Sequence, residues 1–319
     1  ATGMPVREAE IQRVIDKIAW LKKEADKLEQ IQAEMDRTGA DQISETDPDA
    51  RSMAITSRHP RVVGYNVQSA VETEHYLIVA HEVTNIGSDR NALSDMANQA
   101  RDALGAEKLD VVADKGYYKG EEIVDCEDDD ITVTLPKPKT SNAKADGRFD
   151  RSAFIYDAEK NIYICPAGQH LIYRMTRKEG GKVLHRYWTT ACENCPVKHH
   201  CTPGKERRIS RWEHQDVLER VQQRLEDNPD KMATRRETVE HPFGTIKAWM
   251  GATHFKMRTL KHVATEMALH VLAYNMRRVI SIIGAPELAK AIAALLSWFA
   301  RRQGQRMQSV DQMSGFKAI

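Results

Sequence analysis

The chain has 319 residues, 47 of them Lys or Arg and 46 Asp or Glu, which gives a formal net charge of +1. Its mean hydropathy is −0.57, and no stretch approaches the roughly 18 consecutive apolar residues that a membrane helix needs. The first residues lack the charged and then apolar pattern of a secretory signal, and five cysteines are too few for a disulfide scaffold of this length. Length and composition therefore exclude a membrane protein and a small secreted one, and they predict a cytoplasmic protein.

The near-neutral total hides an uneven distribution of charge. Residues 245–308 contain ten Lys or Arg and two acids, a net of +8, whereas residues 1–244 carry −7. Local basic charge determines attraction to phosphate, so this region is predicted to contact the DNA backbone. Its cations beyond Lys247 are Lys256, Arg258, Lys261, Arg277, Arg278, Lys290, Arg301, Arg302 and Arg306. The alternative is that they cover the solvated faces of core helices. Trp249 is expected to pack rather than to stack on a base.

A long helix is predicted for residues 6–37. Apolar side chains recur there in alternating steps of three and four, as in the contact stripe of a coiled coil, within the chain or between subunits. The apolar positions are Ile11, Val14, Ile18, Leu21, Ala25, Leu28 and Met35. The alternative is a plain amphipathic helix on a domain surface.

Strands and helices alternate after a turn-rich stretch at residues 44–51. The predicted elements are a hairpin at 64–71 and 76–83, a helix at 91–104, a strand at 109–114, a helix from 121 and a strand at 131–135. The helix at 91–104 carries Leu93, Met96, Ala97 and Ala100 on one face. This order of elements indicates an α/β protein with a mixed sheet and flanking helices.

The composition changes after Pro136. Pro, Gly, Ser, Tyr and Cys are frequent up to about residue 204, which predicts a small β-rich insertion in the α/β core. Helical periodicity returns at 211–227, 229–250, 259–283 and 286–301. We therefore expect a long helix at 1–43, the first part of the core at 44–136, the insertion at 137–208, the second part of the core at 209–284, and a C-terminal helix with a basic tail at 285–319.

Two acids stand out by their place in the predicted elements. Asp114 ends a strand, and the carboxyl ends of strands are where α/β proteins place their ligands. Arg236, Glu240 and Lys247 stand at offsets of 0, 4 and 11, which share one helix face at about 100° per residue. A carboxylate flanked by cations suits Mg²⁺ or Mn²⁺ beside a phosphate. The alternatives are an ordinary capping acid and an exposed row of ion pairs.

Four segments resemble the bacterial insertion-sequence transposases that have an RNase H-like DDE core. They are GYNVQSAV at 64–71, VVADKGYY at 111–118, EHPFGTIK at 240–247 and LHVLAYNMRR at 269–278. The family's Tyr-(2)-Arg-(3)-Glu-(6)-Lys signature matches at Arg236, Glu240 and Lys247, with Ala233 in place of the tyrosine. The resemblance extends over residues 44–284.

The resemblance implies DNA cleavage and strand transfer by two-metal phosphoryl transfer. Asp114 and Glu240 would be the second and third catalytic acids and would hold Mg²⁺ or Mn²⁺, while Arg236, Lys247 and Lys115 would contact DNA phosphates. The implied partners are double-stranded DNA, both the terminal inverted repeats of the element and the target, and a second copy of the chain in a homodimer at the nucleoid.

The first acid of the family lies on a strand before the one that resembles 64–71, and a long helix separates the two strands. On that alignment residues 6–37 are this helix, so the first acid is expected upstream of residue 1 and the transposase would be incomplete. Asp47 and Asp49 are the local substitutes, although an Asp-Pro-Asp turn makes a poor strand. Weak or absent cleavage is therefore expected. The alternatives are a non-catalytic DNA-binding or dimerising remnant and an RNase H-like nuclease.

Four cysteines fall within the predicted insertion: Cys165, Cys192, Cys195 and Cys201. Thiolates suit tetrahedral Zn²⁺, and the C-x₂-C pair at 192–195 is a usual half-site, so a structural zinc ion is predicted. A histidine at 170, 199 or 200 would be able to replace one thiol. The alternatives are reduced structural cysteines and an iron–sulfur cluster, and Cys126 is expected to be a lone thiol.

Overall fold

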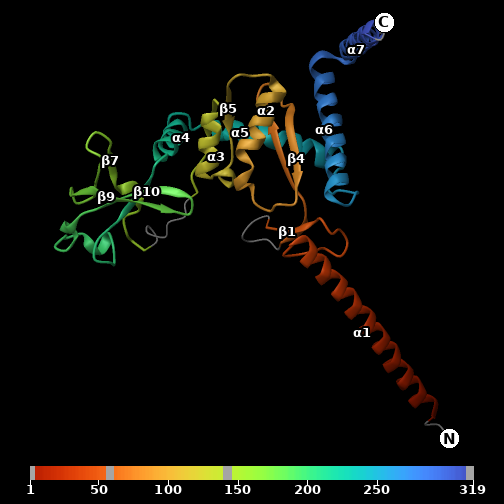
Figure 1. The fold of residues 1–319 in the computed structure, drawn as a ribbon, viewed down its shortest axis with the longest axis horizontal. Helices are drawn as coiled ribbons and strands as arrows, with labels where there is room; N and C mark the ends of the chain where they lie inside the picture. The colour runs from red at the N-terminus through yellow and green to blue at the C-terminus, as the bar shows by residue number, and fades with distance from the viewer. Residues whose placement is uncertain (1–3, 55–60, 139–145, 314–319) are drawn as a thin grey trace, which may run out of the picture. The chain divides into compact units, whose positions relative to one another are not determined.

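The computed structural model describes residues 4–54, 61–138 and 146–313, with side chains described for residues 7–299 and 301 inside these ranges (Figure 1). The chain forms two compact units, one made of Ala1–Gly87 and Glu240–Ile319 and the other of Ser88–Val239. The division differs from the five expected segments because the hairpin shares one core with the helix at Leu260–Ile283. The side chains of Arg302 and Arg306 and the end of the predicted tail lie outside the described residues.

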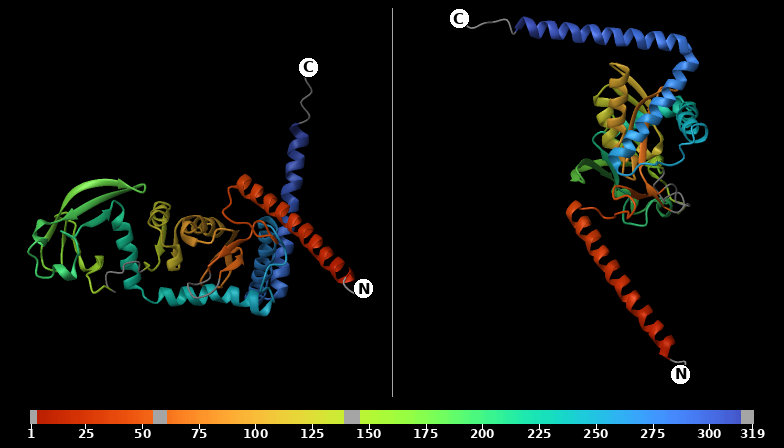
Figure 2. Two further views of the ribbon diagram at one scale, coloured as in Figure 1. Left: turned by 90° about the horizontal axis from the view of Figure 1, so that it is seen from below. Right: turned by 90° about the vertical axis from the view of Figure 1, so that its right-hand side faces the viewer.

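The first unit begins with one unbroken helix, α1 (Met4–Thr38), which confirms the predicted helix (Figure 2). Gly39 follows it at a φ of +67°, a left-handed conformation that glycine adopts without a steric cost. The large apolar side chains of its predicted stripe are exposed: Ile11, Val14, Ile18, Leu21 and Leu28. α1 therefore presents an apolar stripe to solvent.

Two antiparallel strand pairs follow in this unit. β1 (Arg51–Met53) pairs with β2 (Val62–Gly64), and β3 (Asn66–Val71) pairs with β4 (Ile78–Thr84). The second pair confirms the predicted hairpin, and it packs against α6 (Leu260–Ile283). The core of the unit is apolar and is formed by Ile78, Val83, Ile246, Val263, Met267, Val271 and Tyr274.

α7 (Ala285–Met313) follows α6 after Gly284, whose φ is +84°. The two helices meet at a bend of 115°. No single helix in the described part of the chain is long and apolar enough to cross a membrane. Among the described residues, α6 and residues 285–299 reach the necessary length and apolar composition only when they are taken together as a bent pair.

The second unit contains a small α/β layer. β5 (Leu109–Val112) and β6 (Ile131–Thr134) are parallel neighbours, joined by the crossover helix α3 (Gly120–Asp128). α2 (Leu93–Leu104) buries the face that the sequence predicts, and α4 (Gln215–Asp227) packs on the same core. The core residues are Leu93, Ala97, Ala113, Ile123, Cys126, Ile131, Val133, Leu135, Val217 and Val221. Burial raises the pKa of the Cys126 thiol to about 12.

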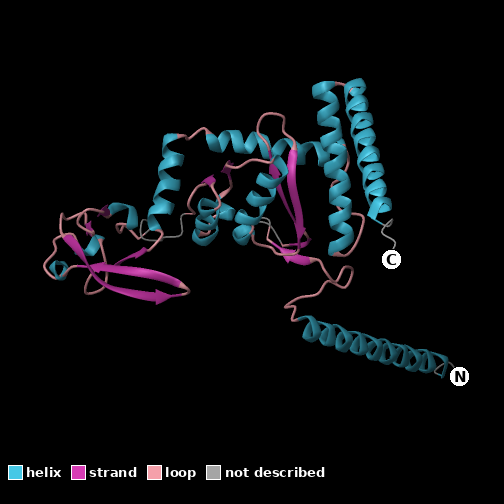
Figure 3. Cartoon of the chain, turned by 45° about the horizontal axis from the view of Figure 1, so that its top comes forward, coloured by secondary structure: helices cyan, strands magenta, loops and turns pink. Residues whose placement is uncertain are grey.

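The predicted insertion is a five-stranded antiparallel sheet (Figure 3). Its strands are β7 (Ile155–Asp157), β8 (Ile162–Ile164), β9 (His170–Glu179), β10 (Lys182–Trp188) and β11 (Ile209–Trp212), in the order β11-β10-β9-β8-β7. Gly180 and Gly181, at φ of +56° and +79°, form the two-residue turn between β9 and β10, which requires positive φ at both positions. Short 3-10 turns complete it at η3 (Arg151–Ala153), η4 (Thr190–Cys192) and η5 (Lys198–His200).

The α/β class follows the prediction, and residues 155–212 form a β-rich sheet, while the view of this region as an insertion into one core stays a prediction. Two details differ from the prediction. Arg211 and Trp212 belong to β11 and not to a helix, because they pair with His185 and Leu184 of β10. In the described residues β3-β4 and β5-β6 are separate two-stranded ladders rather than one continuous mixed sheet. The RNase H-like arrangement therefore stays a prediction.

Candidate active site and cysteine pocket

Asp114 lies two residues beyond the end of β5, close to the strand end at which the sequence predicts it. Its carboxylate caps the 3-10 turn η2 (Lys115–Tyr117), because Oδ1 accepts a hydrogen bond from the Gly116 N–H at 2.9 Å. Oδ2 lies 3.7 Å from Nη1 of Arg235, and the Asp114 side chain is 45% exposed. Lys115 is exposed beside it. Asp114 is therefore held at one oxygen and accessible at the other.

A second acid, Asp89, stands beside Asp114. Asp89 belongs to η1 (Asp89–Asn91). Both carboxylates approach Gly116: a Cβ built on this glycine would lie 3.3 Å from Asp89 Oδ2 and 3.8 Å from Asp114 Oδ1. Burial raises the pKa of Tyr117 to about 12, with Asp89 adding to the rise. Neither Asp89 nor Arg235 was singled out from the sequence. The only local signal was Ser88 before Asp89, a usual helix start.

Glu240 lies on α5 (Lys231–Gly244), four residues after Arg236, and both side chains are exposed on this helix. Pro242 is accommodated inside the helix and is fully buried. Because proline lacks an N–H donor, the α-helical pattern ends soon afterwards and continues as a π-helical turn, η6 (Thr245–Trp249). Lys247 is exposed in this turn, where the spacing of 100° per residue no longer holds.

The segment after Glu240 is anchored within the first unit. His241 Nδ1 lies 2.9 Å from the Tyr274 hydroxyl, which donates a hydrogen bond to the Tyr76 carbonyl at 2.6 Å. Desolvation, with the nearby Arg278 charge, lowers the pKa of His241. Trp249 is 77% exposed, with the Arg277 guanidinium 5.5 Å from its ring centre, so the expected packing of Trp249 is limited to a contact at the surface.

Asp47 and Asp49 cap the first turn of α6. The two Asp47 oxygens accept hydrogen bonds from the Thr259 N–H at 3.1 and 3.2 Å, and Oδ2 also accepts one from the Tyr65 hydroxyl at 2.7 Å. Asp49 Oδ2 accepts a hydrogen bond from the Leu260 N–H at 2.9 Å. These contacts satisfy donors that a helix start leaves unpaired, so a structural role is favoured for both acids over the role of the first catalytic acid.

The loop before α6 presents cations from a fixed backbone. Glu266 is buried, and its carboxylate accepts hydrogen bonds from the N–H groups of Lys256 and Met257 at distances of 2.8 to 3.0 Å. Lys256, Arg258 and Lys261 are exposed. Residues 251–261, which comprise this loop and the first two residues of α6, form the basic loop.

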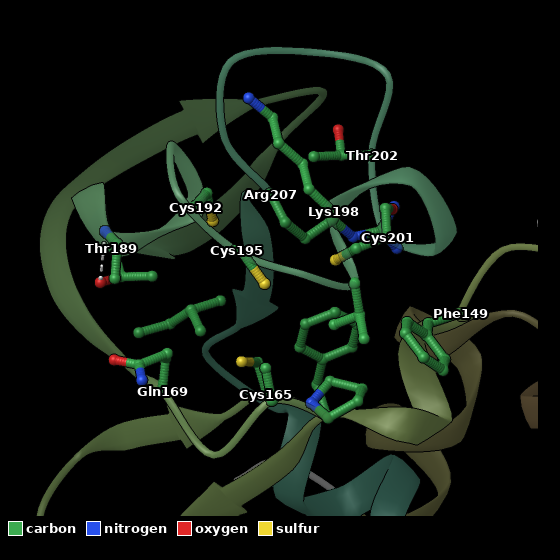
Figure 4. Close-up of a pocket in the computed structure, with 16 residues that line it drawn as sticks. Phe149, Cys165, Gln169, Thr189, Cys192, Cys195, Lys198, Cys201, Thr202 and Arg207 are labelled. Atoms are coloured by element: carbon green, nitrogen blue, oxygen red, sulfur yellow. Dashed lines mark hydrogen bonds between the residues drawn. The ribbon is translucent and has the colours of Figure 1, made fainter.

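The four cysteines of the insertion line a single pocket (Figure 4). Cys165 opens the turn between β8 and β9, whereas the other three lie in the segment between β10 and β11. Figure 4 shows their sulfur atoms turned toward the space that these loops enclose. All four are half-buried and free of disulfides. Desolvation raises the pKa of Cys201, and the neighbouring cysteines add to the rise. Among the described residues, no three Cys, His, Asp or Glu side chains are so arranged that they hold a metal ion as they stand.

The fold is that of a mixed α/β protein that contains a separate five-stranded antiparallel sheet. Residues 164–280 match the protein-family model described as Transposase DDE domain. The matched span includes Glu240 with Arg236 and Lys247, and all four cysteines of the pocket, but not Asp114. No curated protein and no solved structure matches the chain.

Proposed function

We propose that the chain is a DDE-type transposase of a bacterial insertion sequence, which cleaves double-stranded DNA at terminal inverted repeats and joins it to target DNA. The observation that carries the proposal is the exposed Glu240, four residues after Arg236 on α5, inside the span that matches the transposase domain. Such a protein would work in the cytoplasm, at the nucleoid.

Asp114 and Glu240 would provide the carboxylate ligands for Mg²⁺ or Mn²⁺, because these ions prefer oxygen donors. A pair of such ions would activate the attacking water or 3′-hydroxyl and stabilise the leaving oxygen. The donor chemistry fits, since Asp114 is held by the Gly116 N–H through Oδ1, while Oδ2 lies 3.7 Å from Arg235 and would turn to a metal ion that binds there. Asp89, next to Asp114, would help to orient that carboxylate.

Exposed cations would bind the DNA strand near the bond that is cut. Lys115 follows Asp114 directly, and Arg236 and Lys247 lie on either side of Glu240 in the chain. Lys and Arg bind phosphate oxygens without reading the base sequence, so these three residues would position the backbone. The basic loop would add further phosphate contacts.

The chain is expected to cleave DNA weakly on its own. Asp47 and Asp49 have oxygens engaged at the start of α6, and a third carboxylate is needed for tight binding of two metal ions. This consideration favours the second candidate function, a DNA-binding and dimerising transposase remnant. An RNase H-like nuclease would cut without joining strands.

α1 would form the homodimer interface. Its exposed apolar stripe has the steps of three and four that suit pairing with the same stripe of a second copy. Replacing Leu21 by Asp should give a monomer in size-exclusion chromatography with light scattering, whereas replacing exposed Lys22 by Asp should leave the dimer intact. A wild-type chain that is monomeric at all concentrations would exclude this interface.

A metal-dependent nicking assay tests the catalytic proposal. The substrate is a labelled duplex carrying the inverted repeats that flank the gene, and the reaction is run with Mg²⁺ or Mn²⁺ and without either. We expect weak cleavage that Glu240→Gln and Asp114→Asn abolish while DNA binding persists. Glu237→Gln, an exposed acid on the same helix, is the matched control. Cleavage that survives Glu240→Gln would exclude the assigned site, and binding without any cleavage would establish the remnant.

A further inference from the structure

We propose that the four-cysteine pocket binds one structural zinc ion through Cys165, Cys192, Cys195 and Cys201, with Arg207 donating a hydrogen bond to a ligand sulfur. The proposal is independent of the catalytic one, because it concerns the insertion alone. It rests on three observations: the convergence of the thiols, an unsatisfied buried nitrogen and the charge of the lining.

Local hydrogen bonds shape the loops that bring the thiols together. The Gly168 N–H donates to the Cys165 carbonyl at 2.8 Å in the turn between β8 and β9. The Cys195 N–H approaches the Cys192 carbonyl at 3.4 Å, and the Cys201 N–H donates to the Lys198 carbonyl at 2.9 Å. Tight turns of this kind place two thiols of a C-x₂-C pair on one side, as in structural zinc sites.

Arg207 supplies an independent sign that a group is held in this pocket. It lines the pocket, and its Nε is buried without a hydrogen-bond partner in the described part of the chain. Its guanidinium carbon lies 5.4 Å from the Phe154 ring centre, which fixes the side chain against the pocket wall. A buried N–H without an acceptor is unfavourable, and a thiolate of a metal complex would accept this bond.

The charge of the residues that line the pocket also suits a zinc–thiolate complex. Four thiolates around Zn²⁺ carry a net charge of −2, and the two cations that line the pocket are Lys198 and Arg207. The other lining residues are apolar or uncharged, such as Phe154, Leu171 and Gln169, so Lys198 and Arg207 provide the positive charge that would balance a zinc–thiolate complex.

The histidines of the insertion are not needed as ligands. His170, His199 and His200 do not line the pocket, and His200 Nδ1 lies 3.2 Å from the Gly147 carbonyl. The thiols are not yet at coordination distance, which is about 2.3 Å from zinc to sulfur, so side-chain rotation has to close the site when the metal binds. The resulting complex would tie the β8–β9 turn to the loop before β11.

Metal analysis of the full chain, purified under reducing conditions without chelator, tests the proposal. We expect about one zinc per chain, with Cys195→Ser and Cys201→Ser losing it and Cys126→Ala retaining it. Arg207→Met should weaken zinc affinity by about tenfold in a chelator competition, as removal of an outer hydrogen bond does, whereas Arg208→Met is the control.

Since a cysteine variant can fail to fold, the wild-type chain provides a second measurement. Titration with a mercurial reagent should release zinc in step with modification of the pocket thiols, while buried Cys126 reacts only after unfolding. Iron with inorganic sulfide would overturn the assignment in favour of a cluster, and zinc content no higher than in Cys195→Ser would overturn metal binding altogether. Neither result tests the catalytic proposal, because these measurements contain no DNA. The Glu240→Gln variant should also keep its zinc.

Discussion

The Asp47 carboxylate joins three groups that are far apart in sequence: its own loop, the Tyr65 hydroxyl and the Thr259 N–H at the start of α6. Replacing Asp47 by Ala should lower the free energy of unfolding by about 1–2 kcal/mol, the usual cost of losing a helix cap. Asp47→Asn should retain most of the stability, because its amide oxygen still accepts a hydrogen bond.

Urea denaturation of both variants measures this difference. A metal ligand would behave differently from a cap, since Asp47→Asn would then lose metal-dependent cleavage at unchanged stability. Equal destabilisation by Ala and Asn would contradict the capping role.

Glu266 gives the stability of the first unit a defined pH dependence. Burial opposes ionisation, but the Met257 and Lys256 N–H groups and His270 outweigh it, so the pKa of Glu266 lies below its ordinary value of 4.5. A lowered pKa contributes stability that is present above pH 4.5 and is lost as the pH falls through the lowered value.

Glu266→Gln should therefore cost about 2 kcal/mol near neutral pH, the scale of hydrogen bonds to a charged group. The difference from the wild type should shrink at pH values below the lowered pKa. Urea denaturation across this range measures both, with exposed Glu237→Gln as the control. A difference that is constant with pH would show that the charge is not what stabilises the loop.

Single-residue roles were only partly predictable. Asp114 and Glu240 are recognisable because one ends an apolar strand and the other sits in a spaced signature. The neighbours of Asp114, Asp89 and Arg235, come from other elements, and only tertiary packing brings them near its carboxylate. Periodicity likewise gave no sign that Asp47 contacts a helix more than 200 residues away.

At the level of elements, α3 packs closely on the inserted sheet. A Cβ built on Gly120, the first residue of α3, would lie 2.7 Å from Cζ3 of Trp212 on β11. Gly120→Ala should therefore destabilise the second unit by about 1–3 kcal/mol, as overpacking does, although alanine is ordinarily the better helix former.

Thermal unfolding of Gly120→Ala, compared with Gly204→Ala, checks this packing. The nearest atom to a Cβ on Gly204 is 3.7 Å away, so this control should change stability by less than about 0.5 kcal/mol. Equal stability of the two variants would mean that α3 and β11 do not touch.

Long periodic helices were the elements best predicted, as α1 and α6 show, because one repeating pattern extends over many residues. Errors arose where tertiary pairing overrides local preference. Arg211 stands in a stretch with helical periodicity, yet it pairs in β11. Its Nη1 and Nη2 groups donate hydrogen bonds to the Glu219 carboxylate on α4 at 2.5 and 2.7 Å. The π-helical turn after Pro242 was also unpredictable, since the missing proline donor can be accommodated in several ways.

For the whole molecule, the asymmetry of charge predicts how DNA binding responds to salt. Replacing Lys256, Arg258 and Lys261 together by Ala should weaken binding to a fluorescent duplex. It should also make the logarithmic salt dependence shallower, by about 0.9 for each phosphate that the variant no longer neutralises. Lys290→Ala is the matched control, because this cation is paired with Glu287 at 2.6 Å. Weaker binding with an unchanged salt slope would mean that the basic loop does not bind phosphates.

The reactivity of Cys126 in the native chain measures how often the α/β layer around it opens. Its sulfur has no access to solvent, and its pKa of about 12 leaves almost no thiolate at neutral pH. An alkylating reagent can therefore reach it only in molecules whose α/β layer has transiently opened, while pocket thiols without metal react in the closed state. If closing is faster than alkylation, the labelling rate of Cys126 gives the equilibrium constant for opening of this layer in the absence of denaturant.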